Sequence, residues 1–276
     1  MNWLKKIAEK RPLIVCVTNC VTVNDVANVI LAGGASPVVC EEPLELGDFI
    51  RHAGAVLVNF GTVSERSRPL FREAMRAAAE YGCPVVCDPV GVGAAAYRTK
   101  AMMELLDDFP PAVIRCNASE AAALAGMAGS TSGVDAMPRD EISDATLPRH
   151  LEVLRHVAER YRCIVSISGT VDVIGNRTDA YACRNGVPWM SRVTGTGCSL
   201  SGLTAAFAAV ADAPSRLEAV AEATAMMGVA GDMAYGRSAQ LGLGTFHAAL
   251  LDALSMMTDD TLAARKKLEK LKAACG

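Results

Sequence analysis

The residues that point most directly to chemistry lie in the stretch "GTGCSLSG", which runs from Gly195 to Gly202. It places Cys198 where a strand-like run passes through a glycine turn into a long helical pattern. Gly195 and Gly197 let the backbone turn without side-chain clashes, and the free N–H groups at the start of the following helix favour an anion such as phosphate. The turn lacks Gly-Lys-Ser/Thr, so it is not a Walker A loop. A simple structural turn remains the alternative.

Two acidic residues, Asp88 and Glu120, follow neighbouring strand-like runs. Mg²⁺ usually keeps several waters and binds one or two carboxylates together with substrate phosphates. The pair could therefore hold Mg²⁺, directly or through water. The alternative is that Asp88 caps the turn before "PVGVG" and that Glu120 supports the first turn of its helix. The residues alone leave both interpretations open.

Other polar residues and glycines also come directly after apolar runs. In a parallel sheet, ligands bind outside the carboxyl ends of the strands. If these runs are parallel strands, the groups that follow them gather at one edge, although Asn and Asp after a strand also serve as turn formers. The groups concerned are Thr18, Asn19, Asn59, Gly61, Asp88, Arg115, Asn117, Glu120, Ser168, Gly169 and Thr194.

Eight apolar runs predict the strands that must position these groups. Several are continuous β-branched runs, which are typical of a parallel sheet covered on both faces. Helical patterns lie between most of them. One begins at Ser67, a possible cap, and ends at Gly82, and another begins at Asn117 and ends at Gly126. The predicted strands span 12–19, 36–40, 54–61, 83–90, 111–117, 163–169, 171–175 and 187–195.

The order of these elements predicts a three-layer α/β/α sandwich with a mostly parallel central sheet. Residues 1–12 read as a short amphipathic helix, and the chain is almost wholly helical in pattern after residue 197. Residues 127–148 are rich in Gly, Ser, Pro and Asp and predict a surface loop. Because no linker composition interrupts the pattern, we expect one domain over residues 1–276.

Composition excludes several classes of protein. The 276 residues carry a net charge of −3 with mixed signs, so we expect neither a nucleic-acid groove nor a membrane-binding face. The start of the chain does not resemble a signal peptide, and we expect a cytoplasmic protein. Most of the ten cysteines, among them Cys16, Cys40, Cys87 and Cys163, lie in apolar runs and predict small buried side chains rather than a zinc site.

Several motifs together, in order and spacing, resemble the hydroxyethylthiazole kinases of thiamin salvage, which have a ribokinase-like fold. The motifs are "VTNCVTVNDVANVILAGGASPVV", "CDPVGVGA", "IRCNASE", "SGTVDVIG" and "VTGTGCSLSG", and the match runs from about residue 12 to 202. The resemblance implies ATP-dependent phosphorylation of the primary alcohol of 4-methyl-5-(2-hydroxyethyl)thiazole, with Mg²⁺. It also implies a homotrimer with the thiazole pockets at subunit boundaries.

The resemblance also implies roles for single residues. Gly197 and Cys198 complete the anion hole, with Cys198 nearest the attacking hydroxyl, and Val39 stands where the family has a Met. Substrate residues would be Asn19, Val21, Val39 and Gly195, nucleotide residues Arg115, Asn117, Ser168 and Thr194, and metal-associated residues Asp88 and Glu120.

Cys198 is the residue whose role is least determined. A helix N-terminus lowers a thiol pKa, whereas bound phosphates oppose this, so its protonation state stays open. We expect Cys198 to orient the alcohol and to accept its proton late, contributing less than the anion hole. Alternatives are a pyrimidine or pyridoxal kinase, a nicotinamide-nucleotide hydrate dehydratase, which carries Asp at the place of Cys198, and a non-catalytic nucleotide-binding protein.

Overall fold

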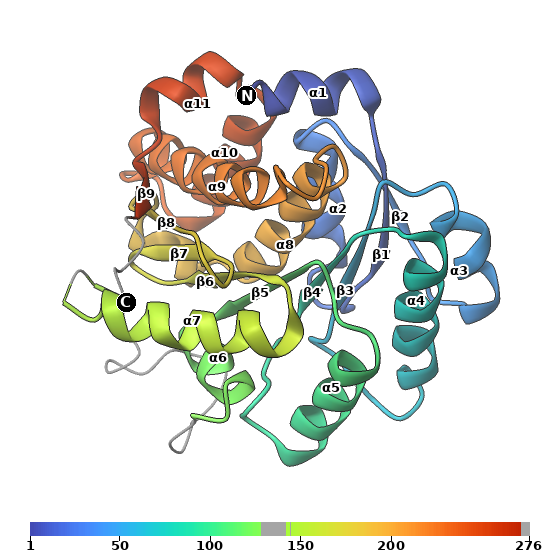
Figure 1. Cartoon of the computed structure of the whole chain (residues 1–276). Coiled ribbons are helices and arrows are strands. Elements are labelled where there is room, and N and C mark those ends of the chain that lie inside the picture. The colour runs from blue at the N-terminus through green and yellow to red at the C-terminus, as the bar shows by residue number, and fades with distance from the viewer. Residues whose placement is uncertain (128–141, 144, 272–276) are drawn as a thin grey trace.

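The computed structural model describes residues 1–127, 142–143 and 145–271 (Figure 1). Most of the loop predicted at 127–148 lies outside the described residues. So does the C-terminal end after residue 271. The prediction of a single domain over 1–276 therefore stays a prediction.

A nine-stranded sheet of order β2-β1-β3-β4-β5-β6-β7-β8-β9 forms the centre of the described structure (Figure 1). The first six strands in this order, β2 to β6 with β1 among them, pair in parallel. The pairs β6–β7, β7–β8 and β8–β9 are antiparallel. The mostly parallel sheet is as predicted. The strands are β1 Leu13–Val17, β2 Ser36–Val39, β3 Ala55–Asn59, β4 Val85–Asp88, β5 Val113–Asn117, β6 Ile164–Ser168, β7 Asp172–Gly175, β8 Ala180–Cys183 and β9 Leu268–Leu271.

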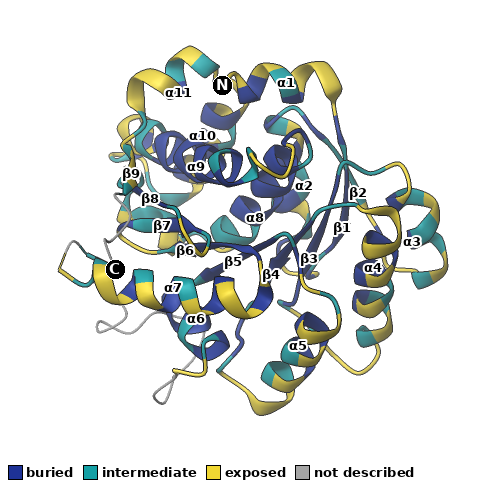
Figure 2. Cartoon of the chain, in the orientation of Figure 1, coloured by how far each residue is buried: buried dark blue, intermediate teal, exposed yellow. Residues whose placement is uncertain are grey.

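Helices cover both faces of the sheet, so the three-layer prediction is confirmed (Figure 2). One apolar core lies between the sheet and α1, α2, α8, α9 and α10, and the other lies between the sheet and α3 to α7. The helices are α1 Trp3–Lys10, α2 Val23–Ala32, α3 Pro43–Ile50, α4 Arg68–Tyr81, α5 Ala96–Asp108, α6 Ala118–Leu124, α7 Leu147–Tyr161, α8 Thr196–Ala208, α9 Arg216–Ser238, α10 Leu243–Ser255 and α11 Asp259–Arg265.

Helix boundaries agree with the predicted signals. α4 ends at Tyr81, and Gly82 caps it with a φ of 64° and donates its N–H to the carbonyl oxygen of Ala78. Ser67 is at the N-cap of α4, but its hydroxyl bonds to Ser64 rather than to the helix. Asn117 caps α6 through its side chain, as predicted. None of the described helices is both long and apolar enough to span a bilayer.

The strand predicted at 187–195 is wrong. Residues Pro188–Arg192 form a short 3₁₀ helix, η2. Pro188 has no N–H to donate to a sheet ladder. Trp189 instead packs edge-on against Tyr235 and Phe246, with ring centroids 5.1 and 5.8 Å apart. The glycine turn thus follows a 3₁₀ helix rather than a strand of the sheet.

The sequence patterns also missed two strands. β8 and β9 pair antiparallel at the end of the sheet, and β9 lies in a region predicted as helical. Their sequences, AYAC and LEKL, contain no β-branched residue, unlike the runs that predicted the other strands. They extend the sheet away from the strand ends that carry the predicted site.

Candidate active site

Asp88 is the centre of a buried hydrogen-bond network. It ends β4 beside Asn59, the last residue of β3, with which it is in register. Asn59 Nδ2 and Ser201 Oγ both donate to Asp88 Oδ2, at 2.8 and 2.7 Å. Oδ1 is buried without a hydrogen-bond partner among the described residues. Burial raises the pKa of Asp88 above its usual value. The side chain therefore does not cap its own turn, and one oxygen is available to a ligand.

Asn19 extends this network from the end of β1. Its Nδ2 lies 2.9 Å from Asn59 Oδ1, 2.8 Å from Thr22 Oγ1 and 3.5 Å from Cys198 Sγ. Its Oδ1 accepts the N–H of Thr22 at 3.0 Å, so the turn into α2 holds the amide in one orientation. A Cβ at Gly61 would lie 2.8 Å from the Asn19 side chain, so only glycine fits there. Asn19 thus links Asp88 to the glycine turn.

The glycine turn begins α8. Gly195 is the N-cap with a φ of 85°, a conformation that L-residues rarely adopt. A Cβ on Gly195 would lie 3.1 Å from Thr22, and one on Gly197 would lie only 2.7 Å from Arg115 Nη1. No side chain caps the helix. Its first N–H groups therefore remain donors for a ligand, and Arg115 lies directly against them.

Arg115 places a positive charge at this helix start. It lies on β5 and is 8% exposed. Nη2 donates to Ser168 Oγ on β6 at 2.5 Å, and Nη1 lies 3.9 Å from Asp88 Oδ2. The guanidinium is thus held between the carboxylate and the glycine turn. A buried cation beside free N–H groups is suited to a phosphate.

Glu120 is bound differently from Asp88. Its Oε2 accepts the N–H of Asn117 at 2.8 Å, and Asn117 Oδ1 accepts the N–H of Glu120, forming a capping box. Its Oε1 accepts the N–H of Gly91 at 2.7 Å. Burial and the charge of Asp88 raise the pKa of Glu120 to about 7. The helix-supporting interpretation is confirmed, and the Asn117 side chain is engaged by α6.

Cys198 is a thiol rather than a thiolate in this environment. Burial, followed by the negative charge of Asp88, raises its pKa above the ordinary value. Hydrogen bonds and the charge of Arg115 oppose the shift without reversing it. These causes are the burial and neighbours of the thiol, which the sequence does not show. Among the described residues no group of three or more His, Cys, Asp or Glu could hold a metal.

A pocket of about 410 Å³ opens on the Arg115 side of the glycine turn. Arg115, Ser168 and Gly197 line it, together with the apolar side chains of Met190 and Met227. Thr194 lines a separate pocket of about 220 Å³ with residues of α2 and α10. The remaining lining of the larger pocket is Gly169, Thr170, Asp172, Asn185, Gly186, Val187, Pro188, Ser191, Thr196, Leu200, Thr224 and Gly228.

The structure brings most predicted residues together but leaves two at the surface. Asn19, Asp88, Arg115, Ser168, Gly195, Gly197 and Cys198 are joined through the contacts described above. Val21 is 65% exposed and Val39, at the end of the edge strand β2, is 38% exposed. Neither valine lines the two pockets beside the glycine turn.

Two residues of the site went unnoticed in the sequence. Ser201 donates to Asp88, and its position four residues after Gly197 places both on one face of α8. Asp172 accepts the N–H of Gly169 at 3.0 Å and lines the larger pocket. Burial raises the pKa of Asp172 to about 7. Helical spacing could have indicated Ser201.

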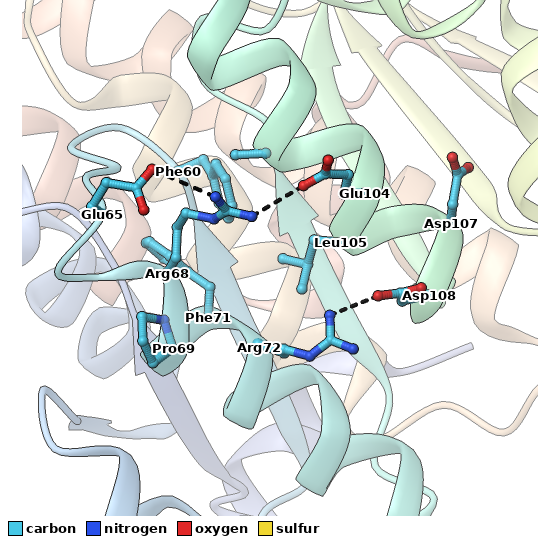
Figure 3. Close-up of a pocket in the computed structure, with 11 residues that line it drawn as sticks. Phe60, Glu65, Arg68, Pro69, Phe71, Arg72, Glu104, Leu105, Asp107 and Asp108 are labelled. Carbon is cyan, nitrogen blue, oxygen red and sulfur yellow. Dashed lines mark hydrogen bonds and ion pairs between the residues drawn. The ribbon is translucent and has the colours of Figure 1, made fainter.

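A second hollow of about 650 Å³ lies between α4 and α5, and no predicted site residue lines it (Figure 3). Its arginines are already paired, Arg68 with Glu104 at 3.0 Å and Arg72 with Asp108 at 2.6 Å (Figure 3). Exposed ion pairs of this kind contribute little free energy. The pocket at the glycine turn is therefore the better candidate for chemistry.

The chain is similar to known proteins over nearly its whole length. The model of the hydroxyethylthiazole kinase family matches residues 4–260. The hydroxyethylthiazole kinase of Cutibacterium acnes is 41% identical over 98% of this chain and 93% of its own length. That of Clostridium tetani is 37% identical over 97% of this chain and 96% of its own length.

Solved structures show the same relationship. The hydroxyethylthiazole kinase of Pyrococcus horikoshii OT3 superposes with a TM-score of 0.86 at 31% identity, covering 98% of both chains. A pyridoxal kinase of Staphylococcus aureus shares only the fold, with a TM-score of 0.57 at 14% identity over 94% of this chain and 99% of its own. With a family match over nearly its whole length, this chain belongs to the hydroxyethylthiazole kinase family.

Proposed function

We propose that the chain transfers the γ-phosphoryl group of ATP to the hydroxyethyl alcohol of 4-methyl-5-(2-hydroxyethyl)thiazole. The observation that carries the proposal is the contact between Gly197 and Arg115 beside Asp88. It combines free helix N–H groups, a buried cation and a carboxylate at one sheet edge. Phosphoryl transfer needs this combination, because its loose transition state is stabilised mainly by positioning and charge.

The pocket of about 410 Å³ beside the glycine turn suits the nucleotide. Its lining offers Arg115, the Ser168 hydroxyl and the start of α8 to the phosphates. Leu200, Met190 and Met227 also line the pocket, and their apolar side chains suit the flat faces of a base. Two of the predicted nucleotide residues suit ATP less well. The side chain of Asn117 caps α6, and Thr194 lines the separate pocket of about 220 Å³.

Asp88 fits a magnesium ion. Its Oδ1 is buried and has no hydrogen-bond partner in the described part of the chain, whereas both oxygens of Glu120 already accept backbone N–H groups. We therefore assign Asp88 as the direct ligand and Glu120 as a second charge acting through water. The ion would neutralise charge on the phosphates when bound. Asn59 and Ser201 keep the carboxylate oriented in the absence of the ion.

We infer that Cys198 and Asn19 orient the alcohol. Asn19 Nδ2 lies 3.5 Å from Cys198 Sγ, so the amide and the thiol lie side by side at the glycine turn. A protonated thiol cannot take up a further proton at ordinary pH. We therefore assign Cys198 the role of orienting the alcohol rather than that of accepting its proton.

The exposed valines support a trimer with shared pockets. Val21, Val39 and Leu44, which is 91% exposed, place apolar side chains at the surface. A neighbouring subunit covering this surface would enclose the thiazole. Size measurement by light scattering tests the assembly, and a monomer at enzyme-assay concentrations would contradict it. A cytoplasmic location also stays a prediction.

The function is tested by a phosphotransfer assay over thiazole, pyrimidine and pyridoxal alcohols, with ATP and Mg²⁺. We expect product only, or at least a clear preference, with the thiazole alcohol. Phosphorylation of only the other two would refute the substrate but not the kinase. Incubation with ATP and hydrated NADH tests the dehydratase alternative, and ATP binding without any turnover would indicate a non-catalytic protein.

A further inference from the structure

Arg98 makes an unusual set of contacts next to the acidic pair. Its Nη1 lies 2.7 Å from the carbonyl oxygen of Phe60, 3.1 Å from that of Gly61 and 2.8 Å from that of Val90. Since Nη1 carries two hydrogens, three acceptors must share them. The three carbonyl dipoles therefore converge on one positive centre. Such an arrangement is the one that backbone carbonyls offer to a bound cation.

The position of Arg98 within its helix does not by itself favour an arginine. Arg98 is the third residue of α5, whose start carries the positive end of the helix dipole. A cation is disfavoured there. The side chain is half-buried and points to the loops after β3 and β4 rather than to solvent. The three carbonyls offset the repulsion of the helix start.

The contacts of Arg98 lead directly to the residues that hold the site. Gly61, whose carbonyl it binds, donates its N–H to Asn59 Oδ1 at 3.0 Å, and Asn59 in turn holds Asp88. Val90 precedes Gly91, whose N–H holds Glu120. One guanidinium thus connects the two loops that orient the two carboxylates.

Gly91 is shaped to accept this arginine. It has a φ of 75°, and a Cβ there would lie 3.1 Å from Arg98 Cδ. Any side chain at residue 91 would press on the arginine and strain the backbone. The close approach of Gly91 and Arg98 is therefore built into the loop after β4.

We propose that Arg98 is a positioning residue that acts as a built-in cation, clamping the loops after β3 and β4 so that Asp88 and Glu120 face the transferred phosphate. Its catalytic consequence rests on the proposed function. Without the guanidinium, three carbonyl groups that point at one another lose their common partner and the loops separate. A displacement of about 1 Å near reacting groups costs about 100-fold in rate.

The first test needs no substrate. Hydrogen exchange is compared for wild-type protein and Arg98→Ala, with Arg72→Ala as a matched control that removes an exposed arginine ion pair. We expect faster exchange at the Gly61 and Gly91 N–H groups in Arg98→Ala only. Unchanged exchange at both would overturn the clamp. Because this readout is independent of turnover, it remains decisive if the substrate proves to be another alcohol.

The second test is chemical rescue. Guanidinium chloride, well below its denaturing range, is added to Arg98→Ala during turnover and exchange measurements. We expect a 10- to 100-fold loss of kcat, a higher Mg²⁺ requirement, and partial recovery of both with guanidinium but not with urea. Recovery with neither reagent, or with both equally, would overturn the cationic role.

Conservative variants keep the proposal testable if Arg98→Ala does not fold. Arg98→Lys keeps a charge with three donors, whereas Arg98→Met keeps length without charge. We expect Arg98→Lys to retain more activity and more exchange protection than Arg98→Met. Equal values for the two variants would show that packing, not charge, is what residue 98 contributes.

Discussion

Gly197→Ala adds one methyl group at the point where α8 approaches Arg115. The new Cβ would lie 2.7 Å from Nη1, 3.2 Å from Nη2 and 3.3 Å from Cζ. Arg115 cannot simply swing into solvent, because it is 8% exposed and tied to Ser168. The guanidinium must therefore move by roughly 0.7 Å to restore ordinary contact, which starts at about 3.4 Å.

The size of the effect follows from what the guanidinium does. Misplacement of a positioning group by about 1 Å costs about 100-fold, and loss of one charge-stabilising donor costs about 100- to 1,000-fold. For a shift of roughly 0.7 Å we expect kcat/KM for ATP to fall about 30- to 100-fold, or about 2–3 kcal/mol. Alanine is about 0.5–1 kcal/mol better than glycine within a helix, which offsets part of the steric cost to stability.

The assay is steady-state phosphotransfer with varied ATP, together with thermal unfolding. Gly236→Ala is the matched control, because it also lies within a helix and a Cβ there has no neighbour within 4 Å. The control should keep full activity and gain slightly in unfolding temperature. Gly197→Ala should lose activity with at most a small change in unfolding temperature.

Two results would refute this reasoning. If Gly197→Ala kept kcat/KM within threefold of wild type, the contact with Arg115 would not position a catalytic charge. If Cys198→Ala in a folded protein cost much more in kcat than Gly197→Ala, the thiol would outrank the anion hole. The ranking that places the glycine turn first would then be wrong.

Asp88→Asn should lower kcat about 100-fold or more and abolish its dependence on Mg²⁺. The unfolding temperature should not fall, because Asn59 can still donate to the remaining oxygen. An intact dependence on Mg²⁺ would contradict the metal assignment. The pKa of Glu120 is raised from 4.5 to about 7, so between these pH values its carboxyl is protonated in the folded state but ionised in the unfolded state. The free energy of unfolding should therefore fall as pH rises from about 4.5 to about 7, and Glu120→Gln should flatten this slope in denaturant titrations. Iodoacetamide near neutral pH should label the exposed Cys20 before Cys198, because the raised pKa of Cys198 keeps it a thiol. If mass spectrometry shows the reverse order, Cys198 is not protonated.

The sequence indicated the sheet and the position of the glycine turn because both depend on local patterns. Continuous β-branched runs identify covered strands, and the polar residue after each run marks the strand end. Asp88 and Arg115 were found in this way. The 3₁₀ helix Pro188–Arg192 was not, because its apolar residues resemble a strand and only the packing of Trp189 on α9 and α10 decides its conformation.

Tertiary structure decided the partners and charges of the site. Asp88 is bound by Asn59, 29 residues earlier, and by Ser201, 113 residues later, and no local pattern carries such separations. The glycine turn can be recognised in the sequence as a possible anion site. The protonation of Cys198 cannot, because it depends on burial and on the nearby charge of Asp88. Chain order thus determined which groups reach the sheet edge. Packing determined which of them meet, because burial and electrostatic interaction depend on distance in space.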